Sequence, residues 1–246
     1  MAAVRCVFID FDETLNDPHA FHGQFVRAMG SLLAGRFGGD AARWSQAAVE
    51  QLARIDAEYA ERFAGRPLAG YCGWLEAVRE RAAIEMFARM GLPPPPDPAG
   101  TARRTQTEAL RRCSALYPGA PDAIRVLSEA GYRVHLASGQ ESEYLAAALL
   151  DTGLEPCVGT AYGPDLVDCA KEGREYYDRI FAAADVAPRE AVVVDDYPPA
   201  LGWAMEAGAA AIQARVSSPR RQSDVDGVAA VMTDWRELPA LVRMMG

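Results

Sequence analysis

The chain has 246 residues and a formal net charge of −9 at pH 7, and half of its residues are apolar or aromatic. This length allows one large domain or two modest ones. An acidic surface repels phosphodiester backbones, so we expect no nucleic acid among the main partners. No apolar run approaches the roughly 20 residues of a membrane span, so we expect no membrane partner either.

The cysteines and the N-terminus both favour a cytoplasmic protein. The five cysteines are odd in number and none forms a Cys-x-x-Cys pair, which argues against a disulfide framework and a zinc site. The first apolar run leads directly into an acidic motif and offers no cleavage site, so we expect no signal peptide. With three histidines in the whole chain, a multi-histidine metal site is not available.

An apolar run at residues 4–9 predicts a short buried strand. It is followed by Asp10 and Asp12, with Thr14 two residues further on. Residues two apart on a strand share a face, so the two carboxylates start out pointing the same way. Their repulsion should raise one pKa unless a cation lies between them. One carboxylate could then attack as a nucleophile or bind a metal while the other transfers protons, the alternative being a solvated junction between strand and loop.

The next hundred residues carry helical patterns and no strand signal. Apolar side chains recur at spacings of three and four, and a run of prolines at residues 93–96 interrupts the pattern once. We interpret these apolar stripes as core packing, so the segment predicts a small helical bundle inserted after the first strand. The four predicted helices lie at residues 18–37, 44–63, 71–90 and 98–113.

From Tyr117 onward the pattern alternates between helix and strand, which predicts a parallel sheet with helices on both faces. The expected fold class is therefore α/β, a doubly wound parallel sheet in which ligands bind beyond the carboxyl ends of the strands. The core is split in sequence into residues 1–15 and 116–246, and residues 16–115 form the inserted helical domain. The predicted strands lie at residues 132–137, 157–161, 190–194, 210–214 and 228–232, and the predicted helices at residues 121–130, 141–151, 172–184, 199–207 and 235–245.

Further polar residues stand near the ends of the later strands. Ser138 and the pair Asp195-Asp196 each follow a predicted strand. Taken alone, Ser138 would be a helix N-cap and the aspartate pair a solvated turn. Lys171 is the only lysine among 25 basic residues, which indicates a position where a compact point charge is needed, with codon bias as the alternative. Because parallel strands end at one edge of a sheet, we expect these residues to converge on Asp10.

The ordered set of motifs resembles the haloacid dehalogenase-like (HAD) superfamily with a first-type helical cap. The opening motif is the apolar strand followed by Asp10-x-Asp12-x-Thr14-Leu15, and Ser138, Lys171 and Asp195-Asp196 match the later motifs in the family's order. The resemblance covers the whole core, and residues 16–115 stand where the family places its cap. The sequence departs from the commonest family forms at Lys171-Glu172, at Asp195-Asp196 and at Ser-Gly-Gln, which leaves the subfamily open.

The resemblance implies a role for each matched residue. Asp10 would be the nucleophile that forms an aspartyl phosphate, and Asp12 the general acid and base. Lys171 would offset negative charge on the phosphate and on Asp10. The phosphate oxygens would be held by Thr14, Ser138, Gly139 and Lys171. A magnesium ion (Mg2+) would be bound by Asp10, Asp195 and Asp196, with the backbone carbonyl of Asp12 as a further ligand.

The function that follows is a magnesium-dependent phosphatase acting on a small-molecule phosphate ester. Family members that cleave carbon–halogen bonds or phosphonates lack an acid at the position of Asp12, so this chain resembles the phosphatases and phosphomutases. A sugar phosphomutase is the second hypothesis, and a non-catalytic phospho-signalling module the third. The sequence leaves the substrate and the oligomeric state undetermined.

Substrate choice is expected to lie with the inserted helices. The glycine-rich loop at residues 64–73 carries Arg66 and Tyr71 and is a candidate specificity loop, with an ordinary surface turn as the alternative. His19 and His22 follow the first motif closely and could line the mouth of the pocket, unless they are merely histidines on a helix face.

Overall fold

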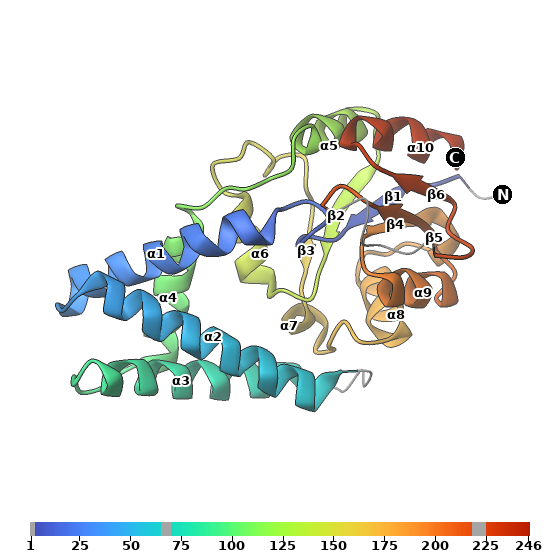
Figure 1. Cartoon of the computed structure of the whole chain (residues 1–246). Helices are drawn as coiled ribbons and strands as arrows, with labels where there is room; N and C mark the ends of the chain where they lie inside the picture. The colour runs from blue at the N-terminus through green and yellow to red at the C-terminus, as the bar shows by residue number, and fades with distance from the viewer. Residues whose placement is uncertain (1–2, 65–69, 218–224) are drawn as a thin grey trace.

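The computed structural model describes residues 3–64, 70–217 and 225–246 of the chain. Its centre is a parallel sheet with the strand order β3-β2-β1-β4-β5-β6 (Figure 1). The order changes direction at β1, which confirms the predicted doubly wound α/β fold and places a crevice at the carboxyl ends of β1 and its neighbours. The strands are β1 (Cys6–Ile9), β2 (Arg133–Ala137), β3 (Ala161–Tyr162), β4 (Ala191–Asp195), β5 (Ala210–Ala214) and β6 (Ala230–Met232).

The sheet is covered on both faces because its strands are apolar on both sides. Side chains alternate along a strand, so Val7 and Ile9 of β1 enter one core while Cys6 and Phe8 enter the other. In Figure 1, α5 and α10 lie over one face and α8 and α9 over the other. The helices of this part are α5 (Ala120–Glu129), α6 (Ser142–Leu149), α7 (Pro164–Val167), α8 (Arg174–Ala183), α9 (Pro198–Glu206) and α10 (Leu238–Met244).

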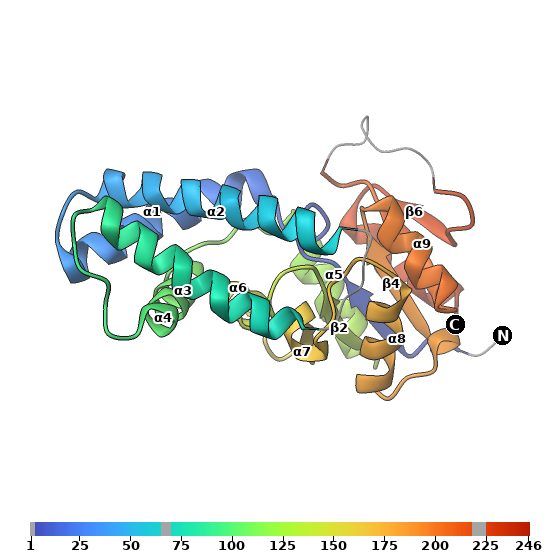
Figure 2. The ribbon, with the colours of Figure 1, turned by 90° about the horizontal axis from the view of Figure 1, so that it is seen from below.

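The helices α1–α4, which follow β1 in the chain, lie together to one side of the sheet (Figures 1 and 2). Asp17, Asp40 and Asp97 cap three of them by accepting backbone N–H bonds in the first turn, which fixes where each helix begins. The division of the chain into two domains at residues 15 and 116 remains a prediction. The helices are α1 (Pro18–Phe37), α2 (Ala41–Phe63), α3 (Tyr71–Arg89) and α4 (Pro98–Leu110).

The strand predicted at residues 157–161 begins later than expected, because β3 covers only Ala161 and Tyr162. The N–H groups of Cys157 and Val158 both bond to the carbonyl of Leu154, so these two residues belong to a turn and not to the strand. The short helix α7 was not predicted, and the predicted tail helix is divided into a 3₁₀ turn (Trp235–Glu237) and α10.

The part of the chain that the structure describes holds no helix with the length and apolar character needed to cross a bilayer.

The imidazole of His135 is buried in the sheet in its neutral form. Its Nδ1 accepts the backbone N–H of Thr160 at 3.0 Å, so the ring proton lies on Nε2. The ring stacks on Phe8 with 5.2 Å between ring centroids. Burial, reinforced by the charge of Arg133, lowers the pKa of His135 from its ordinary 6.5. Protonation would therefore displace the Thr160 bond and place a charge in an apolar core.

We expect His135 to make the protein less stable below pH 6.5. Above that pH the imidazole is neutral in both states, and as the pH falls the unfolded chain binds a proton that the folded chain resists. The free energy of unfolding should then fall by up to about 1.4 kcal/mol per pH unit through this group. His135→Asn keeps an acceptor for Thr160 without the titration, so urea unfolding at pH 7.5 and 5.5 should show a smaller loss in the variant. Equal losses would contradict the assignment.

Candidate active site

The loop after β1 positions the carboxylates of Asp10 and Asp12. The backbone N–H of Asp10 still bonds to Val194 on β4 at 2.9 Å, so Asp10 belongs to the sheet edge. The chain then turns sharply, because the N–H groups of Leu15 and Asn16 both reach back to the carbonyl of Phe11. Glu13 takes the left-handed backbone conformation, with φ of 61°, to close this turn. Phe11 and Leu15 are fully buried and anchor the loop to the core.

Lys171 is the cation at the centre of the site. Its Nζ lies 2.6 Å from Asp10 Oδ1 and 2.7 Å from Asp195 Oδ2, and it donates to the carbonyl of Ala137 at 3.1 Å. Burial opposes the charge, but Asp10 and Asp195 outweigh it and hold the pKa of the ammonium well above its usual value. The three acceptors match the three donors that an ammonium offers from a single atom. A planar guanidinium has no such point of convergence, which gives the solitary lysine a physical reason.

Three carboxylates form a candidate metal site beside this ammonium. Asp10, Asp195 and Asp196 each offer an oxygen, and these oxygens lie within 4.8 Å of one another. Burial, together with the charges of Asp10 and Asp195, raises the pKa of Asp196 to about 7. Such crowding favours a cation, and hard carboxylate oxygens are the ligands that magnesium prefers. The residues present therefore fit the predicted metal.

Thr14 serves the carboxylates and does not face the substrate space. Its Oγ1 donates to Asp196 Oδ1 at 3.0 Å, the side chain is fully buried, and Thr14 does not line the cavity at the sheet edge. Contact of Thr14 with phosphate stays a prediction, and the contact that the structure shows is a positioning bond to Asp196. The indole Nε1 of Trp235 donates to the carbonyl of Thr14 at 3.1 Å and holds this loop from the far end of the chain.

The side chain of Asp12 lies apart from the three-carboxylate cluster. Its Oδ2 accepts the amide of Gln140 at 2.8 Å and its Oδ1 accepts the amide of Asn16 at 3.4 Å. Burial raises the pKa of Asp12 to about 6, and the charge of Asp10 adds to the shift. A carboxyl with this pKa exchanges protons near neutral pH, which suits a general acid and base. Metal binding through its backbone carbonyl remains a prediction.

The loop after β2 brings Ser138 and Gly139 to the same edge. Ser138 Oγ accepts the backbone N–H of Gln140 at 3.3 Å, and Glu141, not Ser138, is the N-cap of α6. The alternative interpretation of Ser138 as a helix cap is therefore wrong. Nothing lies within 4 Å of where a Cβ atom of Gly139 would be, so the loop is open toward the cavity that both residues line.

A cavity of about 570 Å³ joins these groups to the inserted helices. Tyr71 and His22 line it, whereas His19 is exposed and its backbone N–H donates to Asp17 at the start of α1. A role for these residues in substrate binding stays a prediction. Arg66 lies outside the described residues.

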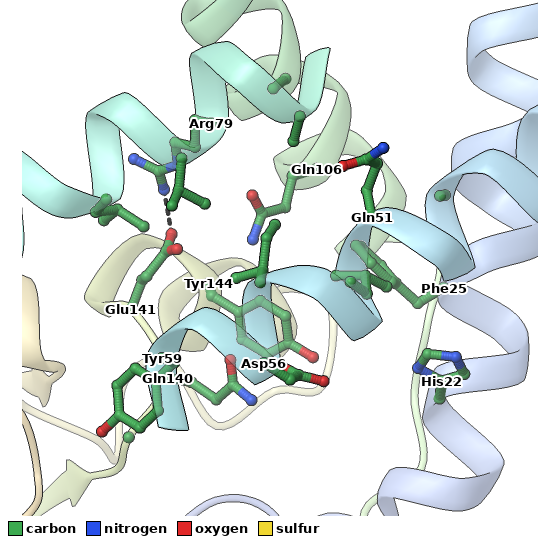
Figure 3. A pocket seen from close by; sticks show the side chains of 18 of the residues that line it. His22, Phe25, Gln51, Asp56, Tyr59, Arg79, Gln106, Gln140, Glu141 and Tyr144 are labelled. Carbon is green, nitrogen blue, oxygen red and sulfur yellow. Dashed lines mark hydrogen bonds and ion pairs between the residues drawn. The ribbon is translucent and has the colours of Figure 1, made fainter. Parts of the chain in front are cut away.

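Two cross-contacts fix α3 against the sheet edge, and the sequence did not reveal them. Arg79 is buried and forms an ion pair with Glu141 at the start of α6 (Figure 3). Asp168 accepts the N–H groups of Gly70 at 3.1 Å and Cys72 at 3.2 Å. The one sequence signal was the charge of Arg79 on a helix face rich in apolar residues, and it gave no indication of a partner 62 positions away. Gln140 stood out in the sequence only as a departure from the commonest family form, and nothing indicated its bond to Asp12.

One comparison with known proteins identifies the family of this chain. The model for haloacid dehalogenase-like hydrolases matches residues 4–199, whereas the comparison with curated protein sequences gives no significant match. A 2-haloacid dehalogenase from Pseudomonas syringae has a similar structure, with a TM-score of 0.70 and 18% identity over 99% of this chain and 100% of that chain.

Two further solved structures share the fold. The L-2-haloacid dehalogenase from Xanthobacter autotrophicus with chloropropionic acid covalently bound has a TM-score of 0.59 and 17% identity, over 99% of this chain and 100% of that chain. A HAD family hydrolase from Deinococcus radiodurans with bound phosphate and sodium has a TM-score of 0.54 and 22% identity, over 100% and 98%. At such low identity the likeness concerns the fold alone.

We expect magnesium to stabilise the protein through the three carboxylates. After treatment with EDTA, magnesium at about 100 times its dissociation constant should add about 2.7 kcal/mol, several degrees in Tm. Asp196→Asn leaves the ion pairs of Lys171 in place and removes one charged ligand, so it should weaken magnesium binding by at least about tenfold. Asp122→Asn, at an exposed helix start outside the cluster, is the matched control. Equal shifts in all three proteins would contradict the site.

Proposed function

This chain belongs to the haloacid dehalogenase-like hydrolases, and from that premise we propose that it is a magnesium-dependent phosphatase that hydrolyses a small phosphorylated metabolite through an aspartyl phosphate. The observation that carries the proposal is the carboxyl of Asp12, which is held by Gln140 and Asn16 and has a pKa of about 6. Such a group is needed where the leaving atom must receive a proton.

The chemistry of the leaving group favours a phosphate ester over a carbon–halogen bond. A halide departs as a very weak base and needs no proton, whereas the alkoxide of an alkyl phosphate is strongly basic and must be protonated as it leaves. The crowding of Asp10, Asp195 and Asp196 points in the same direction. These carboxylates fit a cation, and a phosphate dianion is a substrate whose charge such a cation offsets.

The reaction can be followed through the side chains of this chain. Asp10, oriented by Lys171, attacks phosphorus, so a new O–P bond forms as the ester O–P bond breaks. Asp12 gives its proton to the leaving oxygen and then takes a proton from the water that attacks the aspartyl phosphate, which frees Asp10. Ser138 and the backbone at Gly139 bind the transferring oxygens, and Lys171 offsets their charge. A magnesium ion held by Asp10, Asp195 and Asp196 would supply further positive charge.

Replacing the nucleophile should abolish turnover and leave the fold intact. In Asp10→Asn the amide oxygen still accepts a bond from Lys171, whose second ion pair with Asp195 remains. We therefore expect no release of inorganic phosphate from p-nitrophenyl phosphate, with circular dichroism and the Tm close to those of the native chain. An Asp10→Asn variant that turns over at the native rate would overturn the assignment.

Replacing the acid should matter most for substrates with basic leaving groups. Asp12→Asn cannot donate a proton, so kcat/KM for an alkyl phosphate should fall by roughly 10²- to 10⁴-fold. The loss for p-nitrophenyl phosphate should be distinctly smaller, because its phenolate leaves without a proton. Asp122→Asn, the same change at an exposed helix start away from the site, is a suitable comparison. If Asp12→Asn slows both substrates equally, Asp12 is not the general acid.

A further inference from the structure

The cavity extends well beyond the groups that would bind a phosphate. Along α3 it is lined from Tyr71 to Phe87, which corresponds to about 24 Å of helix rise. We call the part enclosed by the four inserted helices the helical chamber. Its walls are mainly apolar and include Phe25, Leu33, Leu52, Val78, Ala82 and Met86. One space therefore connects the sheet edge to the interior of the helical bundle.

Several polar groups along this chamber already have partners. Gln51 donates to Glu85 at 2.9 Å, and the hydroxyl of Thr105 donates to the carbonyl of Thr101 at 2.8 Å. The guanidinium of Arg79 is bound by Glu141 (Figure 3), although its buried Nε makes no hydrogen bond to another described residue. A sugar or another hydroxyl-rich group entering here would give up its bonds to water and find few replacements, which is unfavourable.

Water is also a poor occupant of the chamber. A buried water requires two to four polar partners, and the apolar walls of the chamber provide none. Poorly bound waters are displaced favourably by an apolar group of matching shape. The shortage of polar partners and the apolar walls of the chamber therefore both favour an apolar occupant.

Two polar features interrupt the apolar wall without changing its character. Asp56 lies opposite His22, and burial raises the pKa of its carboxyl while His22 opposes the shift. The amide of Gln106 points into the chamber in Figure 3, and no hydrogen bond joins it to another described residue. An occupant that is otherwise apolar can carry a single hydrogen-bonding group at the depth of Gln106.

We propose that the substrate is a phosphate monoester whose leaving group is an extended, mainly apolar chain or ring system seated in the helical chamber. The assignment rests on the proposed phosphatase function, because the phosphate is placed by Lys171, Ser138 and the carboxylates. We place the leaving group in the chamber because a single cavity is lined by the groups of the sheet edge, by Tyr59 and Tyr71, and by the apolar walls. The chamber then recognises the leaving group, and the sheet edge recognises the phosphate.

Binding of n-alkylphosphonates tests the chamber without turnover, because their C–P bond is not a substrate for this chemistry. Titration calorimetry with magnesium, below the micelle concentration, should show affinity rising roughly two- to fourfold per methylene from ethyl to decyl. Ala82→Trp fills the chamber and should end this rise at a shorter chain. Ala88→Trp, on the exposed side of the same helix, is the matched control and should follow the native chain. The series on the native chain is decisive even if Ala82→Trp fails to fold.

Hydrolysis separates this inference from the function on which it rests. The native chain should release phosphate from octyl phosphate with kcat/KM at least about 60-fold above that for ethyl phosphate or glycerol 3-phosphate. Phosphate release with no dependence on chain length, or a preference for glycerol 3-phosphate, would overturn the inference and leave the phosphatase in place. Affinity that rises with chain length, without hydrolysis of any ester, would overturn the phosphatase and leave the apolar ligand assigned to the chamber.

Discussion

The site depends on a buried ammonium surrounded by acceptors from three parts of the sheet. Lys171 contacts the carboxylate after β1, the carboxylate at the end of β4 and the last carbonyl of β2. Burying the carboxylates without a counter-charge would be costly, and burying the lysine alone would be equally so. The interaction therefore allows a concentration of negative charge at the sheet edge, where Asp10, Asp195 and Asp196 form a candidate metal site.

The sequence was most informative where function and backbone geometry coincide. Asp10, Ser138 and Asp195 each stand at or just beyond the end of a parallel strand, and parallel strands end at a common edge, so their convergence followed from the pattern alone. The helices α1–α4 were predictable because apolar residues recur at helical spacing, although α2 begins at Ala41, before the predicted residue 44. Lys171 drew attention as a site residue because it is the single lysine of the chain.

Features set by packing between distant segments were not predictable. Thr14 has the expected residue type at the expected place, yet its hydroxyl is used by Asp196, and only the relative position of two loops decides this. The bond from Gln140 to Asp12 depends on how the loops after β1 and β2 meet, and the ion pair of Arg79 with Glu141 depends on how α3 packs against the start of α6. The chamber is the clearest case, because a stripe of apolar residues looks the same whether it packs against a neighbour or lines a cavity.

The contact between Trp235 and Thr14 has a consequence for how the protein is made. The loop that carries Asp12 is held by a hydrogen bond from an indole more than 200 positions later in the chain. The partners of β1 in the sheet, β2 and β4, are also synthesised much later than β1. The helices α1–α4 lie between these partners and are built from local contacts, which form early. On the ribosome, the first strand would therefore stay unpaired while the bundle assembles, and the catalytic loop would be set only after nearly the whole chain had been synthesised.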